Sequence, residues 1–158
     1  MAQVVINGEN DWRRFWNQIE TDFETLDMKP VLEDELGVLE RLHEDYFFDA
    51  KSPGGESWPA LAPSTVAAKG HARILIDTGR LLQSLTQRGP DAVRNVTGGN
   101  GSFDLVFGTA VPYSVFHDEA TGNRPARQHV GWNDQTLDEV TFHVLDGALE
   151  TMSNGKRS

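Results

Sequence analysis

The sequence predicts a small α+β domain with a mostly antiparallel sheet, a long N-terminal helical hairpin and a C-terminal helix. Apolar residues recur at helical spacing in two N-terminal segments and one C-terminal segment. A clean apolar alternation over 102–108 follows the glycine-rich stretch 98–101, which indicates a β-hairpin. The 158 residues, 38% of them apolar, suffice for one modest core. We therefore expect one domain over 1–152 and a flexible tail over 153–158.

The N-terminal part is expected to begin with a short strand over 4–6 and to continue into two helices. Asn10 or Asp11 can cap the first helix, and its apolar residues share one face: Trp12, Phe15, Trp16, Ile19, Phe23 and Leu26. Pro30 suits the first turn of the second helix, whose apolar stripe comprises Leu32, Leu36, Leu39, His43, Tyr46 and Phe47. Joined near 27–30, the two helices would form an antiparallel hairpin.

The middle of the chain is punctuated by proline and glycine, which predicts an irregular loop before a short helix from Ser64. Trp58 either fills the core or anchors an interface, since a large aromatic in such a loop can do both. The apolar run 74–76 is expected to be a strand or an extended buried segment. Asp77 or Thr78 then caps a helix that carries Leu81, Leu82 and Leu85.

The C-terminal half is expected to hold the hairpin, a helical turn and the last helix. The two strands cover 91–97 and 102–108, and Pro112 begins a short helical turn that ends near His117. The last helix begins at Asn133 or Asp134 and ends near Met152. Its inward residues are predicted to be Leu137, Val140, Val144, Ala148 and Leu149.

Charge is distributed unevenly along the chain. Of the net charge of −10, residues 9–50 contribute −9 (thirteen acids, four bases) and residues 51–133 contribute +2 (eight bases, six acids). The acidic segment disfavours sequence-independent DNA binding, because it would repel phosphates. It is either a solvated helical face, or it faces the basic middle of a neighbouring subunit in a ring or lines a channel through which DNA slides. Assembly that depends on salt would favour the subunit contact.

Composition excludes several kinds of site. The chain has no cysteine, which excludes disulfides, thiolate catalysis and cysteine-ligated zinc. No apolar run is long enough to span a bilayer, and the first eight residues lack the features of a secretory signal. We therefore expect no membrane association and folding in a cytoplasm.

Three short patterns invite an enzymatic or metal-binding interpretation. Asp77-Thr78-Gly79 after an apolar run is similar to the motif of retroviral-type aspartic proteases, in which two such Asp residues from two subunits share a proton. The Arg that follows and the preceding helices do not suit that enzyme, and helix capping is the simpler role. Glu40 and His43 have the spacing of a di-iron ligand pair, but a second pair is missing. His117-Asp118-Glu119 lacks a nucleophile in an activating context.

Two blocks of motifs carry a family resemblance. The first is Gly55-x-x-Trp58-x-x-Leu61, then Lys69-Gly70, then Ile74-Leu75-x-x-Thr78-Gly79-x-Leu81-x-x-Ser84. The second is Gly108-Thr109 with Tyr113 and His117, followed by Arg124-Pro125-Ala126-Arg127. In this order the blocks resemble the phage virion morphogenesis or tail completion family. The resemblance covers residues 54–131, and it departs from the family pattern at Gln128-His129-Val130-Gly131, where the family has P-F-x-G.

The resemblance implies a structural, non-enzymatic virion protein that completes the phage tail or joins it to the head. Such proteins act as rings, commonly sixfold, that contact the tail tube and neck or connector proteins, with DNA only as passing cargo and without cofactors or metals. Another neck role, as connector or adaptor, remains an alternative, as does the protease that uses Asp77. The expected location is the virion, after assembly in the bacterial cytoplasm. Candidate interface or fold-anchoring residues are Trp58, Thr78, Gly79, Tyr113, His117, Arg124 and Arg127.

Overall fold

The computed structural model describes residues 9–99, 102–120 and 122–155. The predicted strand over 4–6 and the last three residues of the predicted tail lie outside this part. In chain order the elements are α1 (Glu9–Thr25), α2 (Lys29–Asp49), α3 (Pro63–Lys69), α4 (Arg80–Thr86), β1 (Ala92–Gly99), β2 (Ser102–Thr109), α5 (Val115–Asp118) and α6 (Asp134–Gly155). Helices around a two-stranded antiparallel sheet confirm the predicted α+β class.

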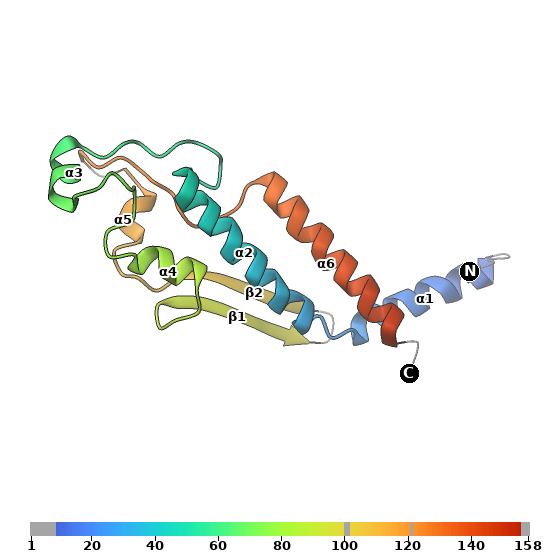
Figure 1. Ribbon diagram of the computed structural model, residues 1–158. Helices are drawn as coiled ribbons and strands as arrows, with labels where there is room; N and C mark the ends of the chain where they lie inside the picture. The colour runs from blue at the N-terminus through green and yellow to red at the C-terminus, as the bar shows by residue number, and fades with distance from the viewer. Residues whose placement is uncertain (1–8, 100–101, 121, 156–158) are drawn as a thin grey trace.

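Helix α2 lies in the middle of the molecule, with α6 on one side and α4 and the β-hairpin on the other (Figure 1). Pro30 lies in its first turn, as predicted. Its buried residues are Glu35, Leu36, Leu39, His43, Tyr46 and Phe47, which largely reproduces the predicted stripe. Gly147 of α6 permits close packing here, because a Cβ at that position would lie 2.8 Å from Cγ1 of Val31.

The predicted hairpin between the first two helices is not seen. Helix α1 extends away from the rest of the molecule in Figure 1, and within the described residues it makes no extensive contact with another element. The apolar stripe of α2 packs instead against α4, α6 and the β-hairpin, which come from later in the chain. Because those elements already bury this stripe, α2 does not need α1 as a partner.

The β-hairpin pairs Ala92 with Thr109 at its open end and Gly99 with Ser102 next to the loop. Strand β2 alternates as predicted: Phe103, Leu105 and Phe107 are half-buried, whereas the residues between them are exposed. Gly98 has a φ of 135°, and a Cβ there would collide with the backbone of Ser102 and Phe103. This close approach of the two strands therefore requires glycine.

The segment before α4 differs from the prediction. Residues 74–76 are half-buried and contain a turn in which Leu75 has a φ of 55°, so they form neither the strand nor the extended buried segment that was predicted. Helix α4 begins after Gly79, which has a φ of 83°, and no side chain caps it in the usual geometry. The Thr78 hydroxyl lies 3.4 Å from the Arg80 amide, which is a long contact. Three apolar residues predict burial but do not determine an extended backbone. Here their side chains are partly buried against the main hydrophobic cluster, although the backbone turns.

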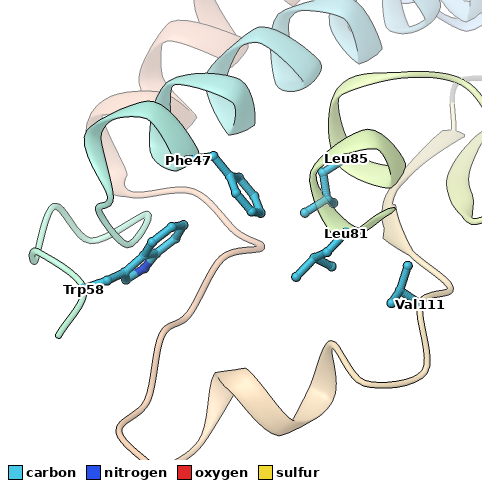
Figure 2. Packing of buried hydrophobic residues seen from close by; sticks show 5 residues of the cluster. All are labelled: Phe47, Trp58, Leu81, Leu85 and Val111. Atoms are coloured by element: carbon cyan, nitrogen blue, oxygen red, sulfur yellow. The ribbon is translucent and has the colours of Figure 1, made fainter. Parts of the chain in front are cut away.

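The main hydrophobic cluster joins segments that are distant in the sequence: Phe47, Trp58, Leu81, Leu85 and Val111 (Figure 2). The Phe47 and Trp58 rings meet edge to face, with centroids 5.4 Å apart. Leu85 is completely buried, and Leu81 and Val111 are nearly so. The cluster thus fixes the 50–62 loop to α2 and α4.

Helix α6 begins as predicted, because the Asn133 side chain accepts a 2.8 Å hydrogen bond from the Thr136 amide. It continues to Gly155, three residues past the predicted end. Ala148 is buried, but the predicted inward residues Leu137 and Leu149 are 47% and 60% exposed. Leu149 lies with Phe142 and Leu145 at helical spacing, and these three form an exposed apolar outer face on α6. None of the described helices has the length and apolar character needed to cross a membrane.

Candidate functional site

Six of the seven predicted site residues line one cleft of about 650 Å³; Trp58 is the exception. The cleft is formed by two segments distant in sequence, 60–81 and 113–127. Helices α3, α4 and α5, which contribute to these segments, lie together at the end of the molecule opposite α1 (Figure 1). Asp77, the residue of the protease alternative, also lines the cleft. We call this site the cationic cleft.

Four basic residues line the cleft, against the single carboxylate of Asp77: Lys69, Arg80, Arg124 and Arg127. Arg80 is neutralised by two hydrogen bonds to Asp91, of 2.7 and 2.8 Å. Lys69 donates instead to the carbonyl of Arg73 at 2.9 Å. Within the described residues, Lys69, Arg124 and Arg127 have no carboxylate partner. The cleft therefore carries a positive charge that the described chain does not neutralise.

Arg127 joins the two walls of the cleft. Its guanidinium donates to the Pro59 carbonyl at 2.8 and 2.9 Å and to the Ala60 carbonyl at 3.2 Å. Burial lowers its pKa from the ordinary arginine value, but not enough to discharge the group. The acceptors of this guanidinium are therefore backbone carbonyls and not a carboxylate. The side chain therefore holds the 58–62 loop in place while keeping its charge.

Arg124, Tyr113 and His117 form the other side. The Arg124 guanidinium lies 5.9 Å from the centre of the Phe116 ring, at the outer limit of a cation–π contact. Tyr113 and His117 meet edge to face at 6.3 Å. Burial, followed by the neighbouring His129 and Arg127, lowers the pKa of His117. At neutral pH this imidazole is therefore uncharged and acts as part of the wall.

Thr78 and Gly79 form the turn at the start of α4. Thr78 is exposed, and the left-handed φ of Gly79 lets the chain turn into the helix. The Gly79 carbonyl accepts the first helical hydrogen bond, from Gln83 at 2.8 Å. Asp77 is exposed and lies between the turn at 74–75 and helix α4.

Trp58 lies in the hydrophobic cluster and does not line the cleft. It is 5% exposed, and its indole Nε1 donates a 2.9 Å hydrogen bond to the Gln128 carbonyl. This bond ties the loop that holds Trp58 to the 128–131 segment. His129 in that segment is fully buried and contacts Phe47 and His117 edge to face.

The predicted ligand pair does not bind a common partner. Glu40 binds Arg94 at 3.0 Å, while Nδ1 of His43, which is fully buried, lies 2.7 Å from the Leu39 carbonyl. In the described part of the chain, no three His, Asp or Glu side chains are arranged to hold a metal ion.

Arg94 is a central structural residue that sequence reasoning missed. Its side chain is 7% exposed and binds Glu40. It also donates to the carbonyls of Val93, Gly108, Ser84 and Leu85, and its guanidinium lies 3.8 Å from the Phe107 ring centre. An arginine within a predicted strand gives no local signal of this role. Lys69 and Arg80 were also not predicted as site residues, because only the folded chain brings them to the cleft.

No family model, curated protein or solved structure matches this chain. The geometry of the cleft therefore has to be interpreted from its own residues. It combines apolar walls, including Leu61 and Leu75, with cations that lack carboxylate partners. Such a surface can bind an acidic segment with an apolar side.

Proposed function

We propose that this protein is a structural, non-enzymatic virion subunit that completes a phage tail, or joins the tail to the head, as part of an oligomeric ring. The proposal rests first on the order of the motifs between residues 54 and 131. It is supported by the fact that residues of both motif blocks line one cleft. A subunit of this kind works by geometry, since contacts between identical subunits set the diameter of a closed ring.

One observation carries the proposal furthest: the folded chain leaves large apolar surfaces uncovered. Phe142, Leu145 and Leu149 on the outer face of α6 are each at least 50% exposed, and among the described residues α1 makes no extensive contact with another element. Exposed apolar patches of this kind mark interaction surfaces in soluble proteins. A ring subunit needs such surfaces for its neighbours and for the tail tube or connector, whereas an enzyme acting alone does not.

The test is the native mass of the purified protein over a concentration series, alone and with isolated tails. We expect a discrete ring, or co-sedimentation with tails, and the mass of the ring gives its symmetry. Binding to heads without tails would favour the connector or adaptor role. A protein that stays monomeric and ignores both particles would contradict the proposal. A stable dimer whose peptide hydrolysis is abolished by Asp77→Asn would instead support the protease.

A further inference from the structure

We propose that the cationic cleft of one subunit binds helix α1 of a second copy, so that the subunits join head to tail. This inference rests on the proposed function and names the contact that would build the ring. It follows from three properties of the described chain: the charge of the cleft, the character of α1 and the distance between them.

The cleft needs an acidic partner. Lys69, Arg124 and Arg127 point to this, because all three line it and none has a carboxylate partner among the described residues. Arg124 is exposed, so its charge is accessible from outside. The apolar wall next to these cations favours a partner that is also apolar on one side.

Helix α1 has the matching composition. The sequence of α1 contains five acids and two arginines, a net charge of −3. The helix is strongly amphipathic, and by helical spacing acidic position 20 borders its apolar stripe. Glu20 is exposed. An apolar side bordered by a carboxylate complements an apolar cleft bordered by cations.

The two surfaces lie at opposite ends of the molecule. In Figure 1, α3 and α5 are at one end and α1 extends from the other. Helix α1 therefore cannot reach the cleft of its own chain in this arrangement, but it can reach that of a neighbour. Two different surfaces at opposite ends make a heterologous contact, which closes into a ring when the rotation between subunits permits.

Charge reversal in the full-length protein tests the contact. Glu20→Lys and Arg124→Glu should each weaken self-association by about tenfold or more, since each places like charges in contact. Mixing the two variants should restore assembly, because native and reversed contacts can alternate around the ring. Asp45→Lys and Arg88→Glu are matched controls, since they make the same charge changes at exposed sites outside α1 and the cleft.

Crosslinking gives a second measurement that does not depend on affinity. The chain has no cysteine, so Glu20→Cys with Arg124→Cys would introduce the only thiols. Oxidation should give a ladder of covalent oligomers, and Glu20→Cys with Arg88→Cys should not.

The outcomes separate this inference from the proposed function. Rings that survive both charge reversals, together with no ladder, would overturn the α1 contact and leave the ring proposal standing. A protein that never self-associates, with or without tails, would overturn both. Loss of assembly in the single variants, recovery on mixing and a specific ladder would establish the contact.

Discussion

The surroundings of Arg94 and the cationic cleft differ in how arginine charge is used. Around Arg94, one guanidinium binds a carboxylate, four backbone carbonyls and an aromatic ring, all within the same chain. In the cationic cleft, Arg124 contacts an aromatic ring and Arg127 donates to two backbone carbonyls. Neither arginine binds a carboxylate among the described residues. In the first region, folding of the chain supplies all of these partners for the arginine. The second is left with charge that pairs with no carboxylate among the described residues.

The largest expected effect is at Arg94. Arg94→Ala should lower the free energy of unfolding by about 3–5 kcal/mol, because it leaves Glu40 and several carbonyls without their partner in a largely buried site. Urea denaturation measures this loss. Arg88→Ala is the control, and as an exposed change it should stay within about 0.5 kcal/mol. Similar free energies of unfolding for the two variants would contradict the stabilising role of the Arg94 contacts.

The second prediction concerns the pH dependence of the same interior. Burial lowers the pKa of His43 from 6.5 to about 4. The unfolded chain therefore binds a proton more readily, and this contribution to stability is fully present above about pH 6.5 and is lost as the pH falls toward 4. The loss amounts to about 3 kcal/mol.

Urea denaturation of the wild type and of His43→Gln between pH 7 and 4 would measure this contribution. The variant should be less stable at pH 7, because it disturbs a buried site, but its stability should fall less steeply. His129 and His117, whose pKa values are also lowered, remain in both proteins, as does Glu35, whose pKa burial raises. Parallel curves for the two proteins would show that His43 does not titrate in this range.

A smaller effect is expected at the junction between the 50–62 loop and α6. Asn133→Ala removes the helix cap and should cost about 1 kcal/mol. The Asn133 amide also donates to the Pro53 carbonyl at 2.9 Å. Asn133→Asp keeps the cap acceptor but loses that donor, so thermal unfolding should place it between Ala and the wild type. An Asp variant as unstable as Ala would assign the whole effect to the Pro53 bond.

The smallest effect on stability is expected in the cleft. Arg124→Ala should change the free energy of unfolding by no more than about 0.5 kcal/mol, since its side chain is exposed and its one recorded contact is long. The same variant should weaken self-association. Equilibrium unfolding and sedimentation on one preparation measure both, and a large loss of stability would remove the contrast with Arg94.

Local patterns in the sequence determined much of the fold. The α2 stripe, Pro30 in the first turn, the β-hairpin with its alternation at Phe103–Phe107 and the Asn133 cap were all predictable, because each depends on residues within a few positions of one another. The spacing of α1 correctly predicted an amphipathic helix. It could not show which surface, if any, in its own chain would cover the apolar side.

Only the tertiary structure decided the remaining features, because they depend on contacts between distant residues. It brought 60–81 and 113–127 together into one cleft, buried Arg94 among carbonyls from three segments, and turned the apolar residues 74–76 into a bend. It also replaced the expected α1–α2 hairpin with α2–α6 packing. Apolar spacing specifies that a face is buried, whereas the choice of partner depends on competition among all the faces of the folded chain.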